Sequence, residues 1–171
     1  MIWRQALIIL TFTLAAVLVE VTLLSRLGIP GATPDLVVVT VVALALAMGP
    51  VQGAVAGFAA GVLIDLAPPG DTLLGVNAIV YVLIGVITGF AVDPRDRTVP
   101  LLMGIVGLST GAAVLLTAGL DTLLGSDRVD WEQMPSLVLT AALYGLILAP
   151  GMILLTTWVV RRATPEVLVT A

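Results

Sequence analysis

The residue types that most often carry catalysis are scarce in this sequence. It contains no cysteine and no histidine, and its seven basic residues are all arginines. Disulfides, thiolate or imidazole metal ligands, and a cysteine or histidine nucleophile or general base are therefore excluded. The four serines have no nearby base within the apolar stretches. We expect no catalytic, cofactor or metal site, and we interpret Asp127, Asp130 and Glu132 as a solvated acidic loop rather than as ligands of a hard cation.

Carboxylates that interrupt apolar stretches are the remaining candidates for function. The chain is 60% hydrophobic and only 11% charged, whereas a soluble domain is about one quarter charged. A soluble fold of this length has too little interior to hide so much apolar surface, so we expect lipid to be the solvent. A charge near the middle of a membrane span costs about 2.5 to 3.5 kcal/mol on insertion scales. Acidic residues inside these stretches are therefore expected to have a function or a tertiary partner.

Six apolar stretches separated by short loops predict an all-α integral membrane protein, a compact bundle of six transmembrane helices in one domain over residues 1–171. The first stretch has about 20 residues, enough to cross a hydrocarbon core of about 30 Å. A secretory signal has only about 7 to 15 apolar residues, so we expect this helix to be retained. The second and third stretches are separated only by Gly49-Pro50, a natural turn. The expected spans are 5–24, 34–48, 51–66, 72–92, 100–120 and 136–160.

Arginines in short loops predict the orientation in the membrane. With six spans and a cytoplasmic N-terminus, only Arg26 and Arg128 lie outside and the other five arginines lie inside. A second scheme, with 34–66 as one kinked helix and the N-terminus outside, also places five arginines inside. We favour six spans because a helix over 34–66 would be about 50 Å long. Both schemes place the C-terminus in the cytoplasm.

Glycines recur at every fourth position of the third span. Residues four apart lie on one helix face, so Gly53, Gly57 and Gly61 form a strip onto which a neighbouring helix can press its backbone. Gly85 and Gly89 repeat this spacing on the fourth span. The pattern predicts close helix packing inside the bundle, and the alternatives are a homodimer face or a partner groove.

Polar residues near the ends of several spans are expected at the level of the outer leaflet. Thr33-Pro34-Asp35 is typical of an N-cap, an N1 proline and a first-turn acid, so Asp35 is expected to complement the dipole of the second helix. Asp65 ends the third helix, where a carboxylate opposes the dipole, and it is therefore expected to have a functional or tertiary partner. The predicted polar cluster consists of Asp35, Asp65, Arg26 and Asn77, with Glu20 near the outer end of the first helix.

The order of these features resembles the rod shape-determining MreD family. Its members carry a Pro-Asp-Leu or Pro-Asn-Leu opening, a Gly-Pro turn, a Gly-rich helix ending in Asp-Leu, and a Leu-Gly before the next helix. The chain's length and expected topology also fit the family, but Asn77 and the outer loop 121–135 match no family pattern. The matching positions are Pro34, Asp35, Gly49, Pro50, Gly53, Gly57, Gly61, Asp65, Leu66, Leu74 and Gly75.

The resemblance implies a non-enzymatic subunit of the bacterial cell-elongation machinery in the inner membrane. Such a subunit scaffolds or regulates lateral peptidoglycan synthesis with MreC, and the other implied partners are the actin-like MreB, the glycosyltransferase RodA and its penicillin-binding transpeptidase. The family is also similar in architecture to the substrate-binding subunits of energy-coupling-factor vitamin transporters, so a small-molecule-binding subunit is the alternative. Nucleic acid is excluded as a partner, because the net charge is -4 and the largest basic patch is Arg161-Arg162.

Overall fold

The computed structural model describes residues 2–23, 34–67, 74–91, 98–126 and 129–163, which form six helices and no strand. This confirms the predicted all-helical class. The helices α1, α5 and α6 are long and apolar enough to cross a membrane, whereas α2, α3 and α4 have only 13, 17 and 16 residues. The bounds are α1 (Ile2–Thr22), α2 (Leu36–Met48), α3 (Pro50–Leu66), α4 (Val76–Ala91), α5 (Val99–Leu123) and α6 (Met134–Ala163).

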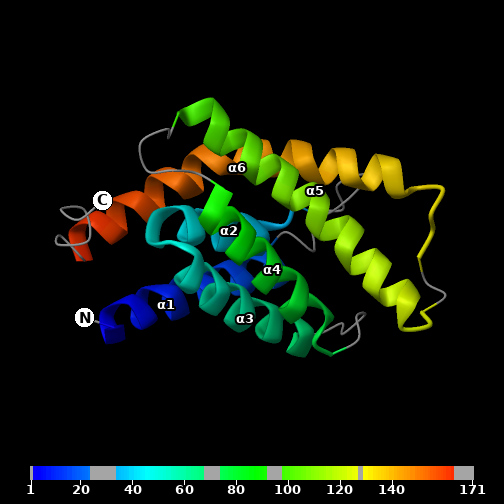
Figure 1. Cartoon of the computed structure of the whole chain (residues 1–171), viewed down its shortest axis with the longest axis horizontal. Helices are drawn as coiled ribbons and strands as arrows, with labels where there is room; N and C mark the ends of the chain where they lie inside the picture. The colour runs from blue at the N-terminus through cyan, green and yellow to red at the C-terminus, as the bar shows by residue number, and fades with distance from the viewer. Residues whose placement is uncertain (1, 24–33, 68–73, 92–97, 127–128, 164–171) are drawn as a thin grey trace.

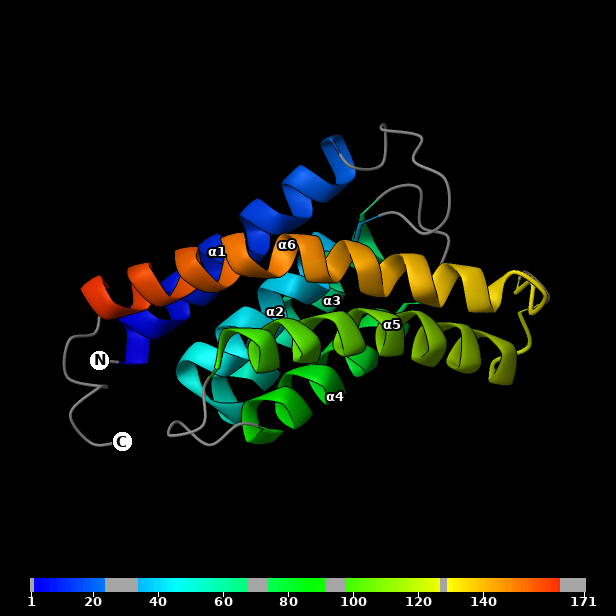
Figure 2. The same cartoon turned by 90° about the horizontal axis from the view of Figure 1, so that it is seen from above.

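The helices run back and forth along the long axis of the molecule. As a result α1 begins and α6 ends at the same end (Figure 1, Figure 2). We call this the basic end, because it carries Arg4, Arg161 and Arg162. At the opposite end α1 and α3 finish and α2 and α4 start, and we call it the acidic end because it carries Glu20, Asp35 and Asp65.

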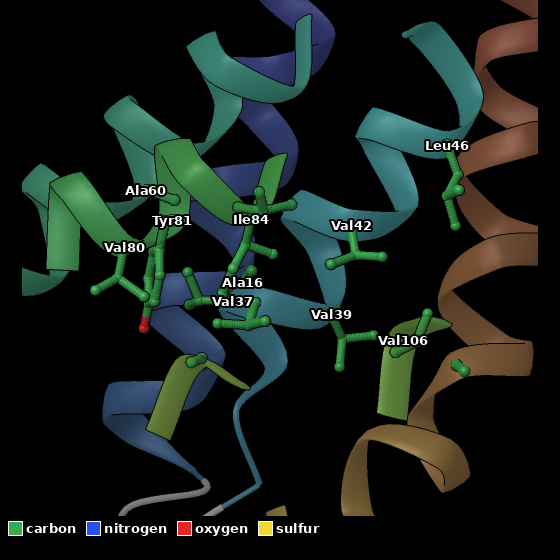
Figure 3. Packing of buried hydrophobic residues seen from close by; sticks show 14 of the residues in the cluster. Ala16, Val37, Val39, Val42, Leu46, Ala60, Val80, Tyr81, Ile84 and Val106 are labelled. Atoms are coloured by element: carbon green, nitrogen blue, oxygen red, sulfur yellow. The ribbon is translucent and has the colours of Figure 1, made fainter. Parts of the chain in front are cut away.

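The short helix α2 forms the centre of the bundle and contacts each of the other five helices. All of its residues from Val37 to Leu46 are buried. Figure 3 shows side chains of α2 together with Ile84 of α4 and Val106 of α5. A helix that is apolar on every side belongs in such an interior. Because protein encloses α2, its length of about 20 Å does not need to match the thickness of a bilayer.

The turn between α2 and α3 depends on two residues. Gly49 has φ 101°, a left-handed conformation that side chains with a Cβ rarely adopt, and Pro50 occupies the first turn of α3. A Cβ atom added at Gly53 would meet the Cβ of Ala45, so α3 folds back along α2. Two residues eight apart in one helix would lie about 12 Å apart. The alternative of a single kinked helix over 34–66 is therefore wrong.

The helices α3 and α4 pack with their backbones in contact. A Cβ atom added at Gly57 would collide with the backbone carbonyl of Tyr81. Gly53 and Gly85 face each other, since a Cβ on either one would meet the carbonyl oxygen of the other. The glycine strip thus faces α4 within the chain itself. The remaining close approaches of this pair are Gly61 to Ala78 and Gly89 to Pro50.

The outer faces of the bundle carry many large apolar side chains that no other helix covers. Contiguous apolar surface of this extent is unusual for a soluble monomer and is compatible with a lipid environment. The exposed residues include Leu10 on α1, Phe58 on α3, Ile87 on α4, Leu108 on α5 and Ile147 on α6.

The helix bounds differ from the expected spans at several ends. The helix α1 ends earlier, at Thr22, α4 begins later, at Val76, and α5 and α6 are longer.

Candidate functional site

The acidic end begins at the N-terminus of α2, which Asp35 caps. Asp35 Oδ1 accepts a hydrogen bond from the backbone N–H of Val38 at 2.7 Å. The sequence predicted Asp35 in the first turn behind a cap at Thr33, and this assignment is wrong. The helix starts at Leu36, so Asp35 is the flanking residue whose carboxylate satisfies the free N–H of the third helical position. Thr33 lies outside the described residues.

Glu20 reaches the same helix N-terminus from α1. Its Oε2 accepts a hydrogen bond from the backbone N–H of Val37 at 2.9 Å. Two carboxylates therefore satisfy two of the four N–H groups that a helix leaves free at its start. Negative charge is also favourable there because of the helix dipole. The contact fixes the last turns of α1 to the central helix, a role that the sequence did not predict for Glu20.

Asp65 holds the start of α4, although it belongs to the last turn of α3. It is 6% exposed, and its Oδ2 accepts from the backbone N–H of Gly75 at 2.8 Å and, more weakly, from that of Ala78 at 3.4 Å. The carboxylate opposes the dipole of its own helix but complements the dipole of the next one. Gly75 has φ 96°, a conformation that suits glycine.

The structure brings together two residues of the predicted cluster. Asn77 Nδ2 donates to Asp65 Oδ1 at 2.9 Å, and Asn77 is itself 6% exposed. Arg26, the other predicted partner of Asp65, lies outside the described residues. A buried carboxylate with hydrogen bonds on both oxygens is a structural clamp between α3 and α4.

Tyr81 connects the two helix starts and was missed in the sequence. Its hydroxyl donates to Asp35 Oδ2 at 3.3 Å, and the side chain is only 4% exposed. The available signal was its position four residues after Asn77, which places both on one face of α4. A buried tyrosine hydroxyl normally finds a hydrogen-bond partner. The resulting network runs from α1 through α2 and α4 to α3.

A cavity of about 460 Å³ adjoins this network and lies between α4, α5 and the start of α6. Its size falls within the range of about 300 to 1,000 Å³ that is typical of small-molecule sites. The lining offers several hydrogen-bond acceptors and donors. Within the described residues, no group of three or more acidic side chains could hold a metal ion. The polar lining includes Asp35, Asn77, Tyr81, Thr117, Asp121 and Gln133.

Comparison of the chain with models of protein families, with curated proteins and with solved structures gives no match.

Proposed function

We propose that this protein is a non-enzymatic membrane subunit of the bacterial cell-elongation complex, similar to the MreD family. It scaffolds or regulates lateral peptidoglycan synthesis with an MreC-like bitopic protein, and MreB, RodA and a penicillin-binding transpeptidase are further partners implied by the resemblance. The observation that carries the proposal is the role of Asp65, which clamps α4 onto α3. A carboxylate used in this way holds two helices together, which is a structural role.

The other residues of the resemblance have architectural roles in the same part of the chain. Asp35 caps α2, Gly49 and Pro50 turn the chain, and the glycine strip joins α3 to α4. These residues thus contribute to a closely packed unit of α2, α3 and α4. Close packing suits a protein that presents a fixed surface to membrane partners. It is not by itself evidence for a particular partner.

In this proposal all six helices lie in the inner membrane and both termini are cytoplasmic. The exposed arginines of the basic end support this orientation, because arginine near span ends favours the cytoplasmic side. The short helices α2, α3 and α4 are compatible with it, since α2 is enclosed by protein and α3 and α4 cover each other along the glycine strip.

A complementation experiment tests the function. The gene is deleted in the rod-shaped bacterium that carries it, and Asp65→Ala is supplied in its place. We expect rounded cells and loss of co-purification with the MreC-like partner, while the chain still inserts into the membrane. Asp130→Ala is the matched control, because the Asp130 carboxylate is exposed. This variant should restore rod shape. Normal shape with Asp65→Ala, or rod-shaped deletion cells, would contradict the proposal.

The cavity beside the network favours a second candidate function, a small-molecule-binding subunit of a vitamin transporter of the energy-coupling-factor type. A ligand should then survive purification and be detected by mass spectrometry of the intact protein. Thr117→Phe would fill the cavity from α5 and should remove the ligand. Under the first function the same variant should leave rod shape unchanged and no small molecule should be retained.

A further inference from the structure

A groove lined mainly by apolar side chains lies between α1 and α6. Near the basic end it is a cavity of about 340 Å³ between the first turns of α1 and the last turn of α6. A second cavity of about 270 Å³ follows deeper along α1. Both are lined by Thr11 and Phe12, so they form one groove, which we call the α1–α6 groove. The lining also includes Leu7, Ile8, Ala15, Val19, Met152 and Leu155.

The dimensions of the groove suit a flexible chain. The stretch of α1 from Arg4 to Val19 is about 22 Å long at 1.5 Å per residue, and one leaflet of a bilayer contributes about 15 Å of hydrocarbon. The groove is therefore long enough to take the acyl chain of a lipid from one leaflet.

The basic end of the groove carries the charge that a phosphate needs. Arg4 lines the groove. Arg161 and Arg162 lie in the last turn of α6, between the lining residues Val159 and Ala163, but do not line the groove themselves. All three are exposed, and none forms an ion pair with a carboxylate of the described residues. Guanidinium groups match phosphate geometry well. Three exposed cations at one end of the bundle, with no counterion among the described residues, favour an anionic ligand.

Two tryptophans mark the same end as the level of lipid headgroups. Trp3 lines the groove, and the guanidinium of Arg162 lies 4.1 Å from the ring centroid of Trp158. Both tryptophans are exposed. Tryptophan is enriched at the membrane–water interface, where the phosphates of lipids lie. The apolar groove therefore starts at the depth from which an acyl chain would descend.

We propose that the α1–α6 groove binds a phospholipid with an anionic headgroup. Arg4 holds the headgroup within the groove, the arginine pair beside the lining residue Ala163 adds positive charge at its mouth, and one acyl chain lies along α1 past Phe12. Basic pockets between transmembrane helices recognise anionic lipids in this manner. The site does not rest on the proposed role in cell elongation.

The test measures lipid binding to the purified full-length chain by native mass spectrometry. The probes are phosphatidylglycerol, phosphatidylcholine with the same acyl chains, and glycerol phosphate. We expect phosphatidylglycerol to bind at least fivefold more tightly than phosphatidylcholine, and glycerol phosphate not to compete. Arg4→Gln should weaken phosphatidylglycerol binding about fivefold, and Arg161→Gln with Arg162→Gln about 25-fold, because each arginine near anionic lipid contributes about this factor.

Two matched controls distinguish an effect of the groove from an effect of total positive charge and from an effect of added side-chain volume. Arg95→Gln removes the same charge elsewhere in the chain and should change binding less than twofold. Ala15→Phe fills the groove and should abolish the preference for phosphatidylglycerol, whereas Ala112→Phe on the exposed face of α5 should preserve it. Circular dichroism verifies that each variant folds, and Arg162→Gln replaces Arg4→Gln if the latter does not.

Several results would overturn the site. Equal binding of phosphatidylglycerol and phosphatidylcholine would refute the anionic preference. Competition by glycerol phosphate would indicate a surface phosphate site without an acyl chain. Equal effects of Arg4→Gln and Arg95→Gln, or of Ala15→Phe and Ala112→Phe, would show that lipid binding does not depend on the α1–α6 groove. A partner helix that cross-links to Phe12 and displaces lipid would identify a protein interface instead.

Discussion

Removing the Asp65 carboxylate should destabilise the fold strongly. Its two short hydrogen bonds come from the backbone N–H of Gly75 and from the amide of Asn77. A hydrogen bond to a charged group contributes about 1.5 to 3 kcal/mol, so Asp65→Ala should lower the free energy of unfolding by about 3 to 6 kcal/mol. We expect the lower part of this range, because Asn77 lines the adjoining cavity and water can reach its amide in the variant.

Asp65→Asn should have a smaller effect. The amide oxygen can still accept from Gly75, and the Asn77 side chain can rotate to offer its oxygen to the new amide. The loss is then one charge at the start of α4, which is about 1 to 2 kcal/mol. The expected order of stability is wild type, Asp65→Asn, Asp65→Ala.

The assay is unfolding in mixed micelles, followed by circular dichroism as the fraction of denaturing detergent rises. Asp130→Ala is the control, since Asp130 also accepts two hydrogen bonds but is exposed, and its removal should change stability by about 0.5 kcal/mol or less. A double-mutant cycle with Asn77→Ala should give a coupling energy of about 1 to 3 kcal/mol. Equal stabilities of Asp65→Ala and Asp130→Ala, or a coupling energy near zero, would refute the reasoning.

Three further predictions concern the helix packing, the α2 cap and the topology. Gly57→Ala should lower stability in the same assay because its Cβ meets the backbone of α4, whereas Gly104→Ala on α5 has open space and should be neutral or slightly stabilising; equal effects would place the strip on a lipid face. Asp35→Asn should cost less than about 1 kcal/mol because asparagine is also a good N-cap, and a loss as large as that of Asp35→Ala would show that the charge itself is needed. Single cysteines at Thr98 and Ser126, at opposite ends of α5, should label from opposite sides with an impermeant maleimide, and labelling from one side would exclude a crossing by α5.

The sequence was sufficient for the all-helical class and for the approximate positions of the helices, whose ends lie within four residues of the expected spans. Breakers such as Gly49-Pro50 divided the chain correctly, and four-residue glycine spacing pointed to the face of α3 that meets α4. It did not identify α2 as the central helix. In a membrane chain a lipid-facing helix and a buried helix are both apolar on every side, so composition does not distinguish them. Only the contacts of α2 with all other helices do.

The site was predicted in part, for a related reason. Asp65 was noticed because it is a carboxylate at the C-terminus of its helix, where the helix dipole makes negative charge unfavourable. A dipole argument confined to α3 gives only this unfavourable energy. The compensation comes from the start of α4, which lies beside the end of α3. Tyr81 was missed because a tyrosine within an apolar helix has the same pattern as a lipid-facing aromatic residue. Its hydrogen bond to Asp35 becomes visible only when α2 and α4 are placed side by side.

The two ends of the bundle use their charges differently, and this difference bears on orientation. The carboxylates of Glu20, Asp35 and Asp65 accept hydrogen bonds from backbone N–H groups at the starts of α2 and α4, so these carboxylates are satisfied within the protein. The arginines of the basic end are exposed and pair with no described carboxylate. Exposed arginines at one end of a membrane protein favour the leaflet surface that is rich in anionic lipid. Its acidic end can then lie toward the other side without carrying free charge from these three carboxylates. The hydrogen bonds that hold the helix starts therefore also support the proposed orientation of the chain.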